Sequence, residues 1–418
     1  MIPNNHPGRR VLLLTTSHTY RAPAFLKAAD RLGIEVVQAV DMPRQLAEQW
    51  QAPLGFPFDQ PETAVQAIVD FAAAHPLDAI LAVDDSGAIL AARASEVLGL
   101  PRNSAAAAEA ARDKYRMRQL LAAAGVPVPV YRRFFTGDDV DAMGAQVTFP
   151  VVVKPTSLSG SRGVIRADNQ DELAAAVQRL TRLLDKTGPG PHPFLVESFI
   201  PGVEVALEGM LDDGRLTVLA LFDKPDPLDG PFFEETIYVT PSRLATAMQT
   251  AIARCTADAA RALGLRTGPI HAELRVNDGG PWIVEVAGRS IGGLCSQTLR
   301  FGPNISLEEL ILRQACGLGL GQWKRDTQAH GVMMIPIPEA GLLKQVGGVA
   351  EAEAVPLIES VTITAPLNNP LVPLPEGESY LGFIFSKGGT PEAVEAALRQ
   401  AHDRLHFEIA PMIPLSLV

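Results

Sequence analysis

The chain has 418 residues, of which 47% are hydrophobic and 20% charged, a composition typical of a soluble globular protein with roughly two to four domains. Its formal net charge of −11 argues against a general nucleic-acid binder, and no run of about 18 apolar residues predicts a membrane span. Cys255, Cys295 and Cys316 are too few and too scattered for a disulfide framework or a zinc site. The first residues lack the apolar core and cleavage site of a signal peptide, so we expect a cytoplasmic protein with reduced thiols.

The N-terminal region alternates apolar strand patterns with helical ones. Strands are predicted at 11–14, 34–40 and 78–83, and helices at 23–32, within 62–74 and at 87–98. This order predicts a parallel sheet in a doubly wound α/β domain, which binds ligands beyond the carboxyl ends of its strands. The segments 15–19 and 84–86 would lie there, and no Gly-x-Gly-x-x-Gly follows the first strand. Asp85 is a candidate for holding a cationic group such as an amine; the alternative is an acid favoured by a helix dipole.

A serine- and glycine-rich loop follows the next predicted strand. One long alanine-rich helix is expected from Ser104 to Ala124, with Ser104 as its N-cap, and the strand 149–155 then carries Lys154 near its end. The loop 156–164 offers backbone N–H groups and hydroxyls to phosphate oxygens, and Lys154 would add a positive charge. The loop is not a Walker motif, and taken alone it also fits a flexible connection.

The region from about 149 to 290 is predicted as a mostly antiparallel α+β unit. Its expected elements are a helix at 171–184, a strand–turn–strand at 194–208, strands at 216–222 and 232–239, and a helix at 242–263. From residue 331 the chain is rich in strands and proline and closes with a helix at 391–405. We interpret this last part as a separate small α+β domain.

A hairpin is predicted from His271 to Arg289, because apolar residues flank the turn sequence Asn-Asp-Gly-Gly. The hairpin brings Glu273 and Glu285 onto neighbouring strands, where two carboxylates in an apolar setting repel unless a cation lies between them. This arrangement predicts a site for a hard divalent metal such as Mg²⁺, which usually brings phosphates with it. Arg289 could reach an anion held by that metal. The alternative is a surface hairpin with solvated charges.

Six motifs occur along the chain in a fixed order. They are Asp113-Lys114, Val-Val-Lys154-Pro, Ser-Gly-Ser-Arg-Gly163, Glu197 to Glu204, His-Ala-Glu273 and Glu285 to Arg289. Over about residues 105–320 this series resembles the ATP-grasp superfamily. Within it the chain looks most like the L-amino-acid ligases, which join two amino acids, because residues 223–241, 285–289 and 381–398 resemble segments of that family.

The resemblance implies a fold and a division into domains. The expected fold is an α/β N-terminal doubly wound domain, an α+β ATP-grasp fold and a small α+β C-terminal domain. The expected boundaries are 1–112 for the first domain, 113–328 for an ATP-grasp domain with two lobes split near 190, and 329–418 for the last.

The resemblance also implies a role for each motif. ATP phosphates would contact Lys114 and Lys154 under the loop Ser159, Gly160, Ser161 and Gly163. The backbone of the hinge from Glu197 to Phe199 would bind adenine, and Glu204 the ribose. Glu273 and Glu285 would hold Mg²⁺ or Mn²⁺, and Arg289 would stabilise an acyl phosphate and its tetrahedral adduct. The amino-acid substrates would contact Asp85, Lys224, Tyr238 and Gly292. From the residues themselves, Lys224 and Tyr238 also fit ordinary strand positions, and His271 fits a structural histidine better than a ligand.

The activity implied is ATP-dependent coupling of a carboxylate to an amine through an acyl phosphate, with ATP and amino acids as small-molecule partners and a homodimer as the expected assembly. The alternatives are an ATP-grasp ligase that uses ammonia, bicarbonate or a thiol, a phosphotransferase, and a regulatory module without turnover. Two departures from the family pattern stand out. Ala287 replaces an asparagine that often follows the second metal glutamate, which leaves the number of metals open, and Tyr238 replaces a histidine of relatives.

Overall fold

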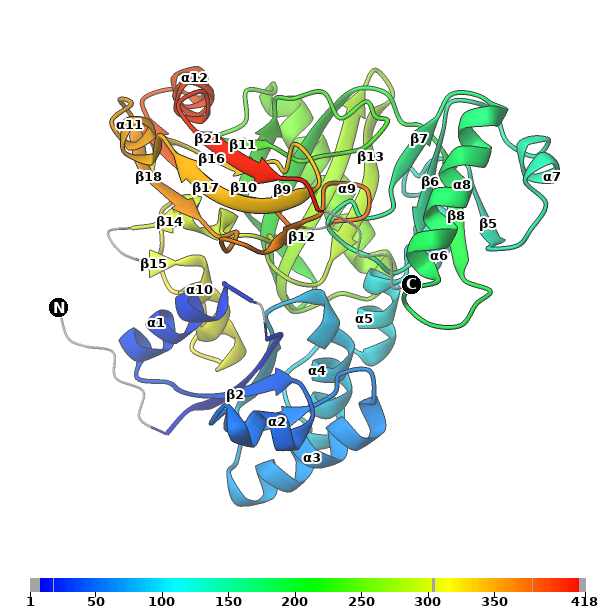
Figure 1. The fold of residues 1–418 in the computed structure, drawn as a ribbon. Coiled ribbons are helices and arrows are strands. Elements are labelled where there is room, and N and C mark those ends of the chain that lie inside the picture. The colour runs from blue at the N-terminus through cyan, green and yellow to red at the C-terminus, as the bar shows by residue number, and fades with distance from the viewer. Residues whose placement is uncertain (1–7, 18, 303–304, 378, 413–418) are drawn as a thin grey trace.

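The computed structural model describes residues 8–17, 19–302, 305–377 and 379–412. Figure 1 shows a lower N-terminal domain, a small lobe on one side, and a large sheet that runs into the C-terminal region. Residues 1–7 and His18 lie outside the described residues. The first seven belong to the stretch judged not to be a signal peptide, and His18 belongs to the predicted ligand-binding segment 15–19. Among the described residues, no helix is long and apolar enough to cross a membrane.

The N-terminal domain is built on a four-stranded parallel sheet of order β3-β2-β1-β4. Its elements are β1 (Arg10–Thr15), α1 (Ala22–Leu32), β2 (Glu35–Asp41), α2 (Arg44–Gln49), β3 (Leu54–Phe56), α3 (Pro61–Ala74), β4 (Ala79–Ala82) and α4 (Asp85–Leu98). Side chains of β1 alternate between two cores: Val11 and Leu13 pack with α1, whereas Leu12 and Leu14 pack with α3 and α4. Both faces of the sheet are therefore covered by helices, which confirms the doubly wound prediction.

The predicted long helix is two helices, α5 (Ala105–Arg112) and α6 (Lys114–Ala123). Asp113 ends the first helix and caps the second, since its side chain accepts a hydrogen bond from the Arg116 N–H at 2.9 Å. The prediction of one continuous helix was wrong, because the alanine-rich pattern hides a strong N-cap residue. The break matters for the site, since the Lys114 N–H is freed to donate to the Thr156 carbonyl at 2.8 Å.

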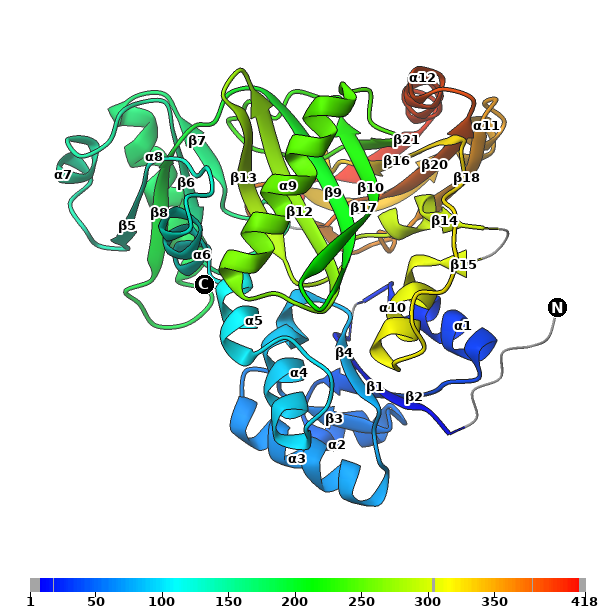
Figure 2. The same cartoon turned by 180° about the vertical axis from the view of Figure 1, so that it is seen from behind.

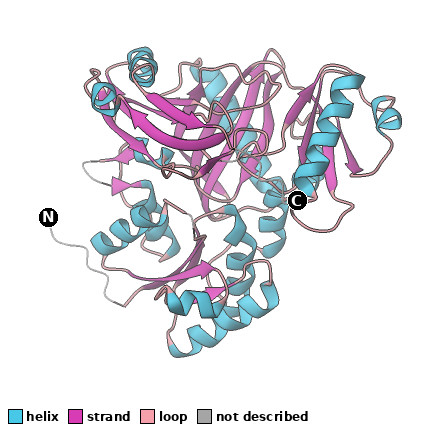
Figure 3. Cartoon of the chain, viewed as in Figure 1, coloured by secondary structure: helices cyan, strands magenta, loops and turns pink. Residues whose placement is uncertain are grey.

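The small lobe is an antiparallel sheet of order β5-β8-β6-β7, with α8 lying against it (Figure 1; Figure 3). Its elements are β5 (Tyr131–Phe135), α7 (Val140–Gly144), β6 (Val151–Pro155), β7 (Ile165–Ala167), α8 (Gln170–Leu184) and β8 (Pro193–Ser198). Asn169 caps α8 by accepting from the Glu172 N–H at 3.0 Å. The apolar face of this helix, with Leu173, Val177 and Leu180, packs on Val153 of the sheet. This packing fixes the strand that carries Lys154.

The large sheet has eight strands in the order β13-β12-β9-β10-β11-β16-β20-β18. Their bounds are β9 (Val203–Asp212), β10 (Arg215–Lys224), β11 (Ile237–Thr240), β12 (Gly268–Asn277), β13 (Gly280–Ala287), β16 (Ala329–Ile335), β18 (Ile358–Ile363) and β20 (Gly382–Gly388). Pairing of β11 with β16 carries the sheet across residue 329, so the predicted boundary does not separate two sheets. The strand expected at 232–239 begins only at Ile237. Helix α9 (Thr246–Leu263) covers one face (Figure 2).

The remaining elements join these parts. They are η1 (Cys295–Thr298), β14 (Arg300–Phe301), β15 (Ile305–Ser306), α10 (Leu307–Ala315), β17 (Gly341–Gly347), α11 (Val349–Glu353), β19 (Pro370–Leu371), α12 (Pro391–His402) and β21 (His406–Ala410). Phe25 and Leu32 of α1 share a core with Leu307 and Ile311 of α10. This shared core fixes the N-terminal domain beside the large sheet, so that the start of α4 faces the end of β13.

Candidate active site

A cavity of about 590 Å³ lies where the N-terminal domain, the small lobe and the large sheet meet. The predicted site residues that line it are Asp85, Lys114, Lys154, Ser159, Gly160, Ser161, Glu197, Phe199, Glu204, Tyr238, Glu273, Glu285, Arg289 and Gly292. Lys224 and Gly163 are not among its lining residues. The sequence motifs, which are spread over about two hundred residues, thus converge on one cleft.

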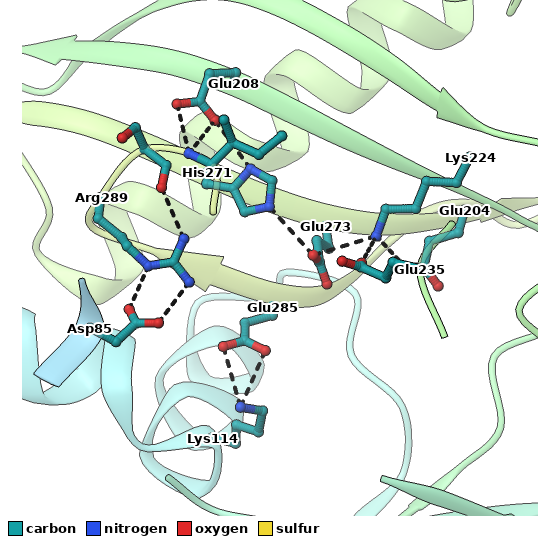
Figure 4. A network of polar contacts seen from close by, with 12 residues as sticks. Asp85, Lys114, Glu204, Glu208, Lys224, Glu235, His271, Glu273, Glu285 and Arg289 are labelled. Atoms are coloured by element: carbon teal, nitrogen blue, oxygen red, sulfur yellow. Dashed lines mark hydrogen bonds and ion pairs between the residues drawn. The ribbon is translucent and has the colours of Figure 1, made fainter. Parts of the chain in front are cut away.

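Glu273 and Glu285 are Cα partners on β12 and β13, next to a register shift between Glu273 and Leu274, so they lie on neighbouring strands as expected. The Lys114 ammonium lies 3.2 Å from each oxygen of Glu285 (Figure 4). The same ammonium donates to the Leu158 carbonyl at 2.8 Å, so it joins the hairpin to the serine- and glycine-rich loop. Lys114 is buried, and its charge is placed between an acidic hairpin and a loop suited to phosphate.

Three carboxylates surround the buried Lys224 ammonium (Figure 4). The ammonium lies 2.8 Å from Glu204 and 3.4 Å from Glu273, and it also contacts Glu235. Lys224 itself is not among the residues that line the cavity, and its contact with an amino-acid substrate stays a prediction. Carboxylate oxygens of Glu204, Glu235 and Glu273 all lie within 4.8 Å of one another. This is an arrangement that a cation stabilises.

The pKa values of two of these acids move in opposite directions. Burial and the Glu273 charge raise the pKa of Glu235 to about 7, although Lys224 opposes the shift. For Glu273, burial acts to raise the pKa, but Lys224 and His271 outweigh it and hold the pKa well below its ordinary value. Glu273 is therefore the charged member at neutral pH, and Glu235 is poised to gain or lose a proton.

His271 lies between two acids. Its Nδ1 is 3.1 Å from Glu208 and its Nε2 is 3.4 Å from Glu273. Burial lowers the pKa of His271, but hydrogen bonds to both acids outweigh it and raise the pKa to about 9. Burial raises the pKa of Glu208, which is fully enclosed.

Arg289 forms a two-pronged ion pair with Asp85, with Nε to Oδ1 at 2.8 Å and Nη2 to Oδ2 at 2.6 Å. Arg112 lies 3.7 Å from the same carboxylate. Burial acts to raise the pKa of Asp85, but Arg289 and Arg112 outweigh it and hold the pKa well below its ordinary value. The carboxylate predicted to hold an amine is thus already balanced by arginines, and its contact with a substrate stays a prediction.

Lys154 and Glu197 form a buried pair 2.5 Å apart at the back of the cavity, and Arg118 donates to Glu197 at 2.7 Å. Burial lowers the pKa of Lys154 to about 8, even though Glu197 opposes the shift. The side chain of Glu197 therefore pairs with two cations of the cleft, Lys154 and Arg118.

ATP affinity should fall as the pH rises through about 8, because Lys154 is charged below this pH and neutral above it. The loss approaches about tenfold per pH unit if the charge is required for binding. The measurement is the ATP dissociation constant from about pH 7 to 9, and Lys154→Arg should flatten the profile because arginine stays protonated. A flat profile for the unaltered protein would contradict this prediction.

The loop of Ser159 to Gly163 is attached to the C-terminal segment around Glu376. The Gly163 N–H donates to the Pro375 carbonyl at 2.7 Å, so this N–H is not available to phosphate, contrary to expectation. Arg162 donates to the Glu376 carbonyl at 3.0 Å. The Glu376 side chain accepts two hydrogen bonds from Arg179, at 2.5 and 2.8 Å. The phosphate-type loop is therefore attached to a segment more than 200 residues away.

Replacing Arg179 by glutamine should weaken this attachment and raise the KM for ATP, by about fivefold at most. The size follows from the roughly 0.2–1 kcal/mol of a partly exposed ion pair. The measurement is a double-mutant cycle: the KM for ATP is determined for Arg179→Gln, for Glu376→Gln and for the double variant. If the two single effects simply add, the proposed contact does not hold the loop.

Phe199 lies in the expected adenine region and lines the cavity. Its N–H donates to the Pro150 carbonyl at 3.0 Å, so a contact of the hinge backbone with adenine would use other backbone groups and stays a prediction. Its ring lies between two guanidinium groups, 4.2 Å from Arg166 and 4.9 Å from Arg275. Gly202 makes the following turn possible: it has φ +114°, and a Cβ there would lie 2.1 Å from the Val276 carbonyl.

Several residues of the cavity were not identified from the sequence: Arg112, Arg118, Glu235, Arg275 and Tyr380. The spacing of Lys114 and Arg118, four residues apart, puts both on one face of α6 and was a usable signal. In the sequence, Glu235 is one of two adjacent glutamates. Which of the two faces the cavity depends on the path of the chain after β10.

The donor set fits a divalent cation. Glu273 and Glu285 lie in register, both line the cavity, and ammonium groups of Lys114 and Lys224 already contact them. Oxygen ligands of this type are those that Mg²⁺ prefers. Ala287 offers no further oxygen from its side chain, whereas Glu235 lies beside Glu273 and does.

Comparisons with known proteins agree with this architecture. Family models match for an ATP-grasp N-terminal domain over residues 26–102, an ATP-grasp domain over 147–298 and an L-amino acid ligase C-terminal domain 2 over 333–410. The crystal structure of an L-amino acid ligase from Bacillus licheniformis superimposes with a TM-score of 0.79 at 26% identity, covering 96% of this chain and 99% of that one.

Among proteins of known sequence, the alanine–anticapsin ligase of Bacillus subtilis is 28% identical over 277 residues, covering 62% of this chain and 58% of the relative. The D-alanine–D-alanine ligase of Desulforudis audaxviator is 31% identical over 215 residues, covering 49% of this chain and 67% of the relative. The chain spans 57% to 62% of the length of the first curated relatives that it matches. The chain belongs to the ATP-grasp superfamily, and its three parts follow the domain order of the L-amino acid ligases within it.

Proposed function

We propose that this protein is an ATP-dependent carboxylate–amine ligase that couples an amino acid to the amine of a second amino acid or a similar amine, with release of ADP and phosphate. The observation that carries the proposal is the convergence of Lys114, Lys154, the Glu273–Glu285 pair and Arg289 on one cavity. Cations for phosphate lie at one end of this set and an arginine for a developing oxyanion at the other. The relatives named above are ligases of this kind.

ATP would lie with its phosphates between Lys114, Lys154 and the loop of Ser159 to Ser161. Lys154 is fixed from behind by Glu197, so it meets the phosphates without reorganisation. The ring of Phe199 and the acid Glu204 border the part of the cleft left for the nucleoside. Mg²⁺ or Mn²⁺, held by Glu273 and Glu285, would neutralise phosphate charge during transfer.

The reaction would have two steps. The substrate carboxylate attacks the γ-phosphorus of ATP and forms an acyl phosphate and ADP. The amine then attacks the acyl carbon, and phosphate leaves. Arg289 would stabilise the negative charge that develops on the acyl oxygen, and Asp85 would keep the guanidinium oriented. Glu235, with its pKa raised to about 7, is suited to take the proton of the attacking ammonium.

The substrate pocket would lie around Tyr238, Gly292 and Tyr380, where the cavity continues past Arg289. Gly292 leaves open space beside it, since a Cβ there meets nothing within 4 Å. This space favours an amino acid over bicarbonate, which needs no such room. A cytoplasmic location stays a prediction from the sequence, and a homodimer stays a prediction of the family resemblance.

The experiment is ADP release by the purified protein across a panel of paired amino acids, with each amino acid alone as the control. The proposal expects turnover that requires two amino acids. Turnover with one substrate plus bicarbonate or ammonia would favour the alternative ligases. A phosphorylated product that accumulates would point to a phosphotransferase instead.

A further inference from the structure

Glu208 of β9 and His271, the first residue of the acidic hairpin, form a buried pair. They are Cα partners on the adjacent strands β9 and β12, and on the other side His271 is paired with Ala287 of β13. Glu208 has 0% of its surface exposed and is not among the lining residues of the cavity, so it cannot itself be a ligand there. Its carboxylate nevertheless faces two groups that belong to the site.

The first group is the imidazole of His271, whose Nδ1 lies 3.1 Å from Glu208 Oε2. The opposite ring nitrogen, Nε2, lies 3.4 Å from Glu273 Oε1 (Figure 4). A chain of contacts therefore runs from an enclosed acid, through a histidine, to the carboxylate proposed to hold the metal. A buried charge is retained only where it is paired, so each member limits the position of the next.

The second group is the backbone N–H of Ile291, which lies 3.1 Å from both oxygens of Glu208. Ile291 follows Arg289 by two residues, in the segment that also contains Gly292. Ser290, in between, accepts a hydrogen bond from Arg21 Nη2 at 2.6 Å. The Glu208 carboxylate is thus connected through His271 to Glu273, the residue proposed to hold the metal. Through Ile291 it is connected to the segment that carries Arg289.

We propose that Glu208 and His271 are positioning residues that orient the Glu273 carboxylate toward the metal and fix the segment carrying Arg289. This inference rests on the metal site of the proposed function and adds the groups that set its geometry. Ligating carboxylates are commonly oriented by outer-shell hydrogen bonds, and losing such a partner costs about 10- to 100-fold in metal affinity. Glu208 does not line the cavity but His271 does, so metal binding is compared with ADP affinity measured without metal.

The test uses two replacements of the same histidine. In His271→Gln the amide reaches the place of Nε2 and keeps a partner for Glu273, whereas in His271→Asn the shorter amide reaches only the place of Nδ1 and leaves Glu273 without it. The readout is the dissociation constant of Mn²⁺ in the presence of ADP, from the electron paramagnetic resonance signal of free Mn²⁺. ADP affinity without metal and the thermal midpoint are measured alongside.

We expect His271→Asn to weaken Mn²⁺ binding about 10- to 100-fold, and His271→Gln, which keeps the contact with Glu273 but loses the one with Glu208, to weaken it less. Glu208→Gln should weaken it as well, because the charge that orients His271 is gone. His330→Asn is the matched control: His330 is also buried and also paired with an acid, Asp326, but it lies outside the lining of the cavity. Its Mn²⁺ affinity should equal that of the unaltered protein.

Equal losses in His271→Asn and His271→Gln would overturn the inference, since disturbed packing does not distinguish the two ends of the ring. Unchanged Mn²⁺ affinity in His271→Asn and Glu208→Gln would also overturn it. A protein that binds ADP but no Mn²⁺ in its unaltered form would instead remove the proposed metal site, and this inference with it. The two failures are therefore told apart by the unaltered protein alone.

Discussion

Arg289→Lys lowers kcat by about 10²- to 10³-fold while ADP still binds with nearly its original affinity. This magnitude is typical for removal of one preorganised group that faces a developing oxyanion. Lysine keeps the charge but not the planar fork, which Arg289 uses to bind both oxygens of Asp85. The variant therefore keeps the positive charge but loses the oriented pair of N–H donors.

Steady-state kinetics with saturating ATP measure this effect, and calorimetry measures ADP binding. Arg300→Lys is the matched control, because Arg300 is an exposed arginine eleven residues later in the chain that forms an ion pair with Glu359, at 3.8 Å. Its kinetics should be unchanged. A near-normal kcat for Arg289→Lys would contradict the role of Arg289 at the reacting carbon.

Glu285→Gln should lower kcat by about 10²- to 10³-fold and shift the Mg²⁺ dependence to higher concentrations. The amide is a weaker ligand for a hard cation than the carboxylate. The change also removes the partner of the Lys114 ammonium, which now lies 3.2 Å from both oxygens of Glu285. The weaker metal ligand and the lost partner of Lys114 both change the charge around the ATP phosphates.

The measurement is kcat as a function of Mg²⁺ concentration. Asp278→Asn, in the exposed turn of the same hairpin, is the control and should leave both kcat and the Mg²⁺ dependence unchanged. If Glu285→Gln and Asp278→Asn behave alike, the hairpin does not hold a metal.

The sequence predicted the hairpin and its turn, because turn chemistry and strand period are local properties. The turn sets the register from Asn277–Gly280 to Leu274–Ile283, and a register shift between Leu274 and Glu273, which the sequence did not reveal, makes Glu273 and Glu285 partners. The N-terminal parallel sheet was predictable for the same reason, since each of its main elements has its own apolar pattern.

What the sequence did not reveal depends on contacts between distant segments. The extension of the large sheet through β11 and β16 is a pairing across about ninety residues, for which neither strand carries a local signal. Lys224 was expected in the substrate pocket, but it is paired with Glu204 of β9, Glu273 of β12 and Glu235, which precedes β11. The attachment of Gly163 to Pro375 likewise joins segments that no motif connects. The break at Asp113 is the exception, because its capping side chain could have been recognised.

The most direct test of the account follows one oxygen atom. An amino acid labelled with ¹⁸O in its carboxylate is incubated with the protein, ATP, Mg²⁺ and a second amino acid, and the phosphate and peptide are analysed by mass spectrometry. Activation through an acyl phosphate predicts one ¹⁸O transferred to inorganic phosphate for each peptide formed, with ADP as the nucleotide product. Unlabelled phosphate, or the release of AMP in place of ADP, would contradict it.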